Sequence, residues 1–173
     1  MKINNPYNAL VLLSLWCVIA CQDVPILNGD DDTPVAQAQY AMRVCADGET
    51  VRGIDVSEHQ GEIDWDAVAA DGIEFAYIRV SDSLSRMDPY FERNWQEAER
   101  VGLLRGVYQY FRPSQDPIEQ AQVLLDAMGP IGPDILPPMF DIETDSNQTD
   151  AVVSSRAQLW LDTVENATGV RPI

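Results

Sequence analysis

The sequence predicts an α/β fold in which parallel strands alternate with helices, the arrangement of a β/α (TIM-like) barrel. Four short apolar stretches with the composition of strands are each followed by a segment with helical spacing. Strands that alternate with helices in this way form parallel sheets joined by crossover helices. In addition, acidic residues stand at the C-terminal ends of the expected strands, the edge at which β/α barrels carry their active sites.

The first residues have the form of a bacterial export signal. Lys2 supplies the positive end, and residues 9–20 form an apolar core that is too short to span a membrane as a stable helix. This core runs into the residues VIAC (18–21), which resemble a lipobox, the signal for lipid attachment to a cysteine and cleavage before it. We therefore expect residues 1–20 to be a signal peptide and Cys21 to be lipidated. An ordinary signal peptide that happens to carry a cysteine is the alternative.

A flexible acidic tether is expected over residues 21–44. It contains the run NGDDDTP (28–34) and shows no amphipathic period. The three aspartates lack the spaced ligands and distal glutamate of a calcium loop, which favours a solvated linker. Cys45 then stands alone, because Cys17 leaves with the signal and Cys21 carries lipid. A lone cysteine in an exported protein suggests a missing partner or a free thiol.

The folded domain is expected to cover residues 45–173. The chain has 173 residues, 46% of them hydrophobic, which is enough for one domain with a sizeable core. Its 28 acidic residues against 11 basic ones give a formal charge of −17. This charge argues against binding nucleic-acid phosphates and against attraction to anionic lipid surfaces. No nucleic-acid partner is expected, and membrane contact is expected only through the N-terminal lipid anchor.

The elements of the domain follow from apolar spacing and helix caps. Asp64 and Asp116 suit the N-cap positions of two helices, and Gly72, Gly102 and Gly169 stand where helices should end. The expected strands cover residues 51–56, 75–80, 104–111 and 138–142. The expected helices cover residues 63–70, 88–101, 117–128 and 150–167. Residues 170–173 look like the approach to a fifth strand.

The fourth expected strand carries the chemistry. It ends in Asp141 and Glu143, which point to one face of a strand while Phe140 and Ile142 point to the other. Two neighbouring carboxylates resist joint ionisation, which raises one pKa and leaves the other group ionised. That division of labour serves the cleavage of a glycosidic bond. An Asp-x-Glu sequence by itself also fits a solvated strand end or a loop.

A third acid, Asp55, ends the first expected strand and should reach the same rim as the Asp-x-Glu pair. His59, in the loop that follows, is the only histidine of the sequence. A histidine-based metal cluster or a Ser-His-Asp triad would rest on it alone, and no nucleophile elbow accompanies it. No metal and no cofactor are expected.

With these motifs in order, the chain resembles the glycoside hydrolase family 25 lysozymes, the Chalaropsis-type muramidases, from about Gly53 to its last residue. The resemblance implies an irregular β/α barrel that hydrolyses the bond between N-acetylmuramic acid and N-acetylglucosamine in peptidoglycan, without a cofactor. It rests on GIDVS (53–57), QG (60–61), IDW (63–65), FAYIR (75–79), Phe91, Asn94, GVYQYFRP (106–113), Asp116, QA (120–121), LPP (136–138) and DIE (141–143).

The resemblance also implies roles for single residues. Glu143 matches the general acid. Asp141 matches the acid that stabilises the developing oxocarbenium charge or orients the substrate N-acetyl group. Asp55 matches a rim aspartate, for which a structural hydrogen-bonding role stays open. Tyr108 and Tyr110 match aromatic residues of the sugar cleft, although strand aromatics commonly serve as core.

The chain departs from the family pattern at two expected substrate contacts and at its end. His59 stands where relatives often have an aromatic residue, and it is expected to be a polar loop or cleft residue and not a catalyst. Asp82 stands where relatives often have a longer glutamate, so a weaker substrate contact is expected there. The family barrel continues with further strands and another rim aspartate beyond Ile173. The expectation is a partial product with the first four β/α units and the start of a fifth.

Three functions are weighed on these observations. The first is an exported, lipid-anchored muramidase that faces the periplasm or the exterior and acts on peptidoglycan glycan strands. The second is a non-catalytic or degenerate peptidoglycan-binding lipoprotein. The third is another β/α glycosidase with a similar pattern. The sequence leaves open whether the target is the cell's own wall and whether hydrolysis retains or inverts configuration.

Overall fold

The structure is a computed structural model that describes residues 48–173, with a compact unit from Val51 to Ile173. The expected signal peptide, the lipidation site Cys21, the tether over 21–44 and Cys45 lie outside the described residues. Within the described part of the chain, no helix has the length and apolar character that crossing a membrane requires.

A parallel sheet forms the centre of this unit. Its strands are β1 (Gly53–Val56), β2 (Phe75–Asp82), β4 (Leu104–Tyr110) and β5 (Met139–Asp141), hydrogen-bonded in the order β1-β2-β4-β5. All three pairings along this path are parallel, as the alternation of strands and helices predicted. A short strand that the sequence did not predict, β3 (Arg86–Met87), pairs antiparallel with the end of β2.

Two helices begin at the caps that the sequence predicted for them. Asp64 accepts a hydrogen bond from the backbone of Ala67 at the start of α1 (Trp65–Ala70). Asp116 accepts two at the start of α3 (Pro117–Met128). The other helices are the 3₁₀ turn η1 (Glu58–Gln60), α2 (Phe91–Arg100) and α4 (Asp150–Thr168). Helix α2 begins three residues later than expected, because the backbone N–H of Asp88 still bonds to Val80 of β2.

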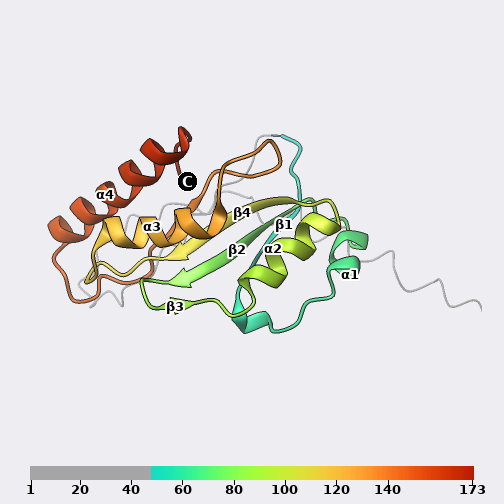
Figure 1. Ribbon diagram of the computed structural model, residues 1–173, viewed down its shortest axis with the longest axis horizontal. Helices are drawn as coiled ribbons and strands as arrows, with labels where there is room; N and C mark the ends of the chain where they lie inside the picture. The colour runs from blue at the N-terminus through green and yellow to red at the C-terminus, as the bar shows by residue number, and fades with distance from the viewer. Residues whose placement is uncertain (1–47) are drawn as a thin grey trace, which may run out of the picture. The chain divides into compact units, whose positions relative to one another are not determined.

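The helices cover one face of the sheet. Figure 1 shows α2 and α3 lying across the strands, with α4 beside α3. The buried core lies between these two layers and includes Ile78, Val107, Phe111, Leu124 and Trp160. Strand residues that alternate with the core positions therefore point to the opposite face of the sheet.

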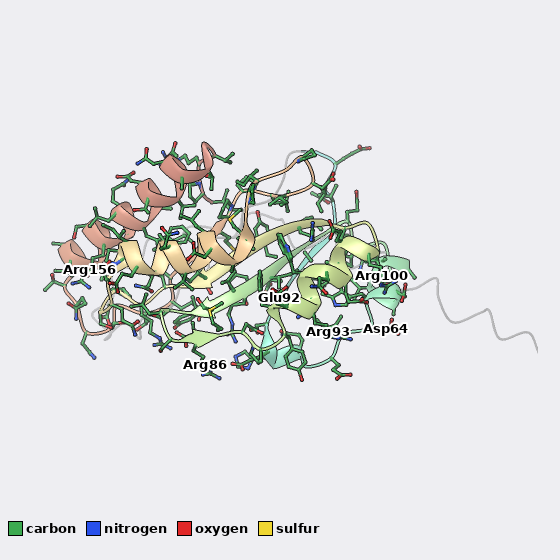
Figure 2. All side chains as sticks on the ribbon, viewed as in Figure 1. Asp64, Arg86, Glu92, Arg93, Arg100 and Arg156 are labelled. Atoms are coloured by element: carbon green, nitrogen blue, oxygen red, sulfur yellow. The ribbon has the colours of Figure 1, made fainter. Side chains whose placement is uncertain are left out.

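Two arginines tie helices to neighbouring segments of the chain. Arg100, labelled near the end of α2 in Figure 2, donates to both carboxylate oxygens of Asp66 on α1, at 3.0 and 2.9 Å. Arg156 of α4 donates to the backbone carbonyls of Pro113 and Gln115, at 2.8 and 3.0 Å. The start of α4 is thereby tied to the loop that precedes α3.

The end of the chain lies along β5. Gly169 ends α4 in the left-handed conformation with φ of 72°, which matches the stop expected there. Residues 170–173 do not form a strand, but Ile173 exchanges backbone hydrogen bonds with the β5 region. Its carbonyl accepts from Phe140 at 2.8 Å, and its N–H donates to Pro138 at 3.0 Å. The last residues thus take the place next to β5 that a fifth strand would occupy.

Candidate active site

Three carboxyl groups from different parts of the chain meet in one open cavity of about 270 Å³. It is lined by Asp55 from β1, Tyr108 from β4, and Met139, Asp141 and Glu143 from β5 and the residues after it. The cavity lies at the C-terminal ends of these strands. The structure therefore brings together the three acids that the sequence placed at one rim.

Alternation along β5 sets the direction of these acids. Residues 139, 141 and 143 all line the cavity. Phe140 points the other way, and its ring centroid lies 4.8 Å from that of Phe111 and 4.9 Å from that of Trp160. Because a shift of one residue would exchange the two faces, the packing of Phe140 against the core holds Asp141 toward the cavity.

The environment makes Asp141 a poor acid. Burial above all, together with the nearby charges of Glu143 and Asp55, raises its pKa to about 6, against an opposing effect of Arg79. Burial penalises the charged form, and like charges penalise it again. The free site therefore holds on to a proton in mildly acidic solution, where an ordinary aspartate would have lost it.

Tyr108 forms a neutral wall of the cavity. Its ring is buried, and burial raises its pKa to about 12, although Arg79 and a hydrogen bond with Ser57 act in the opposite direction. The phenol therefore stays protonated at every physiological pH. It can offer a hydrogen bond and an apolar ring face to a sugar.

The other expected substrate contacts do not line this cavity. The guanidinium of Arg112 lies 4.9 Å from the ring centroid of Tyr110. The same guanidinium holds both carboxylate oxygens of Asp82, at 2.6 and 2.7 Å, and this pairing lowers the pKa of Asp82. His59 is exposed on η1, where its backbone N–H donates to Ser57.

Sequence reasoning missed a buried ionic cluster beside the acids. Arg79 of β2 pairs with Asp88 and with Glu58, each at 3.0 Å, and Asp88 also accepts from the backbone of Glu58 at 2.7 Å. The available signal was an arginine at the centre of an apolar strand, FAYIRV (75–80). A charge in such a place needs partners, and these lie elsewhere in the chain.

Sequence reasoning also gave no role to two polar residues of the resemblance motifs. The buried side chain of Gln120 bonds to the backbone N–H and carbonyl of Arg112, at 3.0 and 3.1 Å. Buried Asn94 accepts from the indole of Trp65 at 3.2 Å. Both residues therefore support the scaffold around the site. Among residues 48–173, no group of three or more His, Cys, Asp or Glu side chains is arranged to hold a metal ion.

Comparisons with known proteins agree with this fold. The family model Glycosyl hydrolases family 25 matches residues 54–173. The solved structure of a family GH25 lysozyme from Aspergillus fumigatus superposes with a TM-score of 0.67 at 25% identity, covering 71% of this chain and 63% of that one. The parallel sheet and its helices are thus those of the irregular β/α barrel that the sequence predicted.

Two curated relatives bear on the length of the chain. The protein YegX of Escherichia coli K12, described as uncharacterized, is 39% identical over 139 residues, which are 78% of this chain and 50% of YegX. Lysozyme M1 of Streptomyces globisporus is 41% identical over 69 residues, which are 40% of this chain and 24% of that protein. The chain spans about half the length, or less, of these relatives. Since the family model covers most of the sequence and the described fold, the chain belongs to glycosyl hydrolase family 25.

Proposed function

We propose that this protein is a peptidoglycan hydrolase of the lysozyme type, which cleaves the β-1,4 bond between N-acetylmuramic acid and N-acetylglucosamine. The observation that carries the proposal is the meeting of Asp55, Asp141 and Glu143 in one cavity of a family 25 chain. Solved and curated relatives include proteins named lysozymes and muramidases.

In the proposed reaction, Glu143 is the proton donor. It lines the cavity with an exposed side chain that a glycosidic oxygen can approach, whereas Asp141 in the same cavity is half-buried. As the bond between the anomeric carbon and this oxygen breaks, its electron pair stays on the oxygen, which takes the proton of Glu143. Asp141 stabilises the positive charge at the anomeric carbon, or orients the substrate N-acetyl group for attack on that carbon.

The proposed reaction requires a proton on the carboxyl of Glu143 and an ionised Asp141. Burial favours the proton on Asp141, while the proposed chemistry uses a proton on Glu143. A developing positive charge next to Asp141 favours its ionised form, because an opposite charge nearby stabilises a carboxylate. In the proposal, Asp141 is therefore ionised as the positive charge develops beside it. Asp55 lies on the far strand and adds negative charge that favours the same cationic transition state.

The proposed substrate is the glycan strand of peptidoglycan. Tyr108 supplies the wall against which a sugar ring packs, and Tyr110 with Arg112 forms a second aromatic and cationic surface at the strand ends. Asp82 contributes by holding Arg112 in place, since both of its carboxylate oxygens are engaged there. His59, exposed directly after β1, is a further polar contact in this proposal.

Loss of turbidity of purified peptidoglycan tests the activity, with the full chain in mild detergent and its Glu143→Gln variant. We expect clearing by the wild type and a loss of at least about a hundredfold in rate for the variant, because the proton donor is removed. Glu119→Gln, an exposed glutamate on α3, is the matched control and should clear as the wild type does.

Two further measurements make this test decisive. Mass spectrometry of the soluble fragments should find N-acetylmuramic acid at the new reducing ends, and chitin should be a poor substrate. A chain that unfolds cooperatively, binds peptidoglycan and yet clears nothing would reject the proposed hydrolase.

We also propose that the protein is exported and anchored by lipid on Cys21 after removal of residues 1–20. The support is the sequence VIAC (18–21) behind an apolar core. In bacteria fed radioactive palmitate, the wild-type chain should carry label and sediment with membranes. The Cys21→Ser variant should carry none, and the Cys45→Ser variant should be labelled as the wild type is. Equal labelling of the Cys21→Ser variant would rule out this anchor.

A further inference from the structure

A buried arginine lies beside the acid cavity and takes no part in the reaction described above. Arg79 is paired with Tyr108 in the register of β2 and β4, and Tyr108 lines the cavity. Paired residues of neighbouring strands point to the same face of a sheet, so Arg79 points to the face that carries the acids. Arginine keeps its charge even when buried. A permanent positive charge therefore lies next to the cavity.

Two carboxylates hold this charge in place. The side chain of Arg79 is 9% exposed, and its Nε atom donates to Asp88, which is 1% exposed, at 3.0 Å. A terminal nitrogen of Arg79 donates to Glu58 at 3.0 Å, and Arg86 of β3 donates to the same oxygen of Glu58. The backbone of Tyr90 also donates to Asp88 at 3.0 Å. Rotation of the guanidinium would break both of its ion pairs, and the donors Arg86 and Tyr90 hold the two carboxylates, so its position is fixed.

Three charged groups and one neutral titratable group surround Asp141. Glu143 follows two residues after it, Asp55 acts on it from β1 and Arg79 from β2, and the neutral phenol of Tyr108 lies on β4. The two acids raise the pKa of Asp141, and Arg79 lowers it. Within residues 48–173, Arg79 is the one cation whose charge has a resolved effect on the pKa of Asp141.

We propose that Arg79 is a positioning residue for the acid site, a fixed positive charge that keeps Asp141 able to ionise beside Asp55 and Glu143. Glu58 weakens the effect of this positive charge, because its carboxylate neutralises part of the charge of Arg79. The neutralisation is incomplete, since Glu58 also pairs with Arg86. The kinetic consequence rests on the proposed hydrolase function. The effect on the ionisation of Asp141 does not, since it is a property of the folded chain.

A second buried arginine shows what a purely structural role would look like. The side chain of Arg105 on β4 is also 9% exposed and also pairs with a glutamate, Glu99, at 2.8 Å. It donates to the carbonyl of Trp95 and lies over that ring, at 4.3 Å from the centroid. Arg105 belongs to the start of β4, whereas the acids lie at or just after the C-terminal ends of β1 and β5. It is the matched control for Arg79.

The test is a titration of the Asp141 carboxyl by carbon-detected NMR in the full chain, assigned by comparison with Asp141→Asn. In the Arg79→Gln variant, we expect the midpoint to rise by about half a pH unit, less than an unshared adjacent charge would give. Arg79→Lys should bring it back toward the wild-type value, because it restores the charge. Glu58→Gln should lower the midpoint, because it removes a negative charge. Arg105→Gln should leave it unchanged.

The opposite signs separate electrostatics from general damage. If Arg79→Gln and Arg105→Gln move the midpoint equally, or if Arg79→Gln and Glu58→Gln move it in the same direction, the proposal is wrong. If Arg79→Gln does not fold, the Arg79→Lys and Glu58→Gln variants still test the proposal. An unchanged or raised titration midpoint of Asp141 in Glu58→Gln overturns the proposal.

Kinetics then connect this effect to the reaction. The acidic limb of the pH profile for peptidoglycan hydrolysis should move with the NMR midpoint, upward in Arg79→Gln and downward in Glu58→Gln. A limb that stays in place while the midpoint moves would show that Arg79 does not act on the reaction through Asp141. A chain that titrates as expected but hydrolyses nothing would count against the hydrolase function alone.

Discussion

Position, and not residue type, distinguishes the carboxyl groups of the site. Asp55 and Glu143 are exposed, whereas Asp141 is half-buried between them and has its pKa raised to about 6 by burial and by its two acidic neighbours. A carboxyl with a raised pKa binds a proton more tightly in the folded state than in the unfolded state. It therefore destabilises the folded protein as the pH rises from its ordinary pKa of 3.8 to its raised pKa of about 6.

Replacement of Asp141 by asparagine should stabilise the protein at neutral pH. A shift from 3.8 to about 6 corresponds to about 3 kcal/mol, which solvent screening at this half-exposed group reduces to about 1 kcal/mol. The free energy of unfolding of Asp141→Asn should exceed that of the wild type at pH 7 and approach it near pH 4. Urea denaturation at both values measures this difference.

Asp126→Asn is the control for this prediction. Asp126 is exposed on α3, so its variant should show no comparable gain. A loss of stability at pH 7 in Asp141→Asn would show that the ionised carboxylate makes contacts that outweigh its desolvation.

Ion pairs of the site could not be read from the sequence. Arg112 and Asp82 lie 30 positions apart, and Arg79 and Glu58 lie 21 apart. Nothing in the local sequence around Asp82 indicates that its carboxylate will form an ion pair with an arginine. The alternation that placed Asp141 and Glu143 on one face is local, and the structure bears out that placement.

At the scale of single elements, local chemistry was sufficient for the helices. Asp116 and Pro117 mark the start of α3, and the helix spans the expected residues 117–128. The two-residue strand β3 has no periodicity that a sequence could show. It forms because the chain turns back on β2 at Ser83, which has a φ of 61°.

On the face of the sheet opposite the helices, the rings of Phe75 and Tyr77 lie over glycines of the neighbouring strands. A Cβ atom at Gly106 would overlap the ring of Tyr77, whose hydroxyl donates to the carbonyl of Pro137 at 2.9 Å. The ring of Tyr77 has little room to move, because this hydrogen bond and the edge-to-face contact with the ring of Phe75 hold it. A glycine is required at position 106 for the close approach of the ring.

Gly106→Ala should therefore cost about 1–3 kcal/mol of stability through overpacking. Gly132→Ala is the control, since a Cβ atom there meets nothing within 4 Å. Thermal unfolding of both variants measures the difference. Equal melting temperatures for the two variants would show that Tyr77 moves aside freely.

At the scale of the whole folded unit, α4 depends on a buried polar contact with the sheet. Trp160 of α4 donates from its indole nitrogen to Gln109 of β4 at 2.8 Å, and Gln109 donates to Ser81 of β2 at 2.9 Å. All three side chains are buried. This chain of hydrogen bonds fixes α4 against β4 and β2, the two central strands of the sheet.

Trp160→Phe should destabilise the protein by about 1–3 kcal/mol, because it leaves the carbonyl of Gln109 buried without its donor. Leu159→Ala, at the exposed neighbouring position, should cost much less. Chemical denaturation of both variants tests this prediction. A Trp160→Phe variant as stable as Leu159→Ala would mean that another donor replaces the indole.

The sequence by itself determined the family, the order of the parallel strands and helices, most helix ends, and the face on which Asp141 and Glu143 lie. These features depend on local spacing and on caps within a few residues of each other. Only the tertiary structure decided which acid is buried, that Arg112 occupies Asp82, and that Arg79 stands beside the cavity between Glu58 and Asp88. The reason is that the ionisation of a carboxyl depends on its solvent exposure and on charges within a few ångströms, which folding brings together from distant parts of the chain.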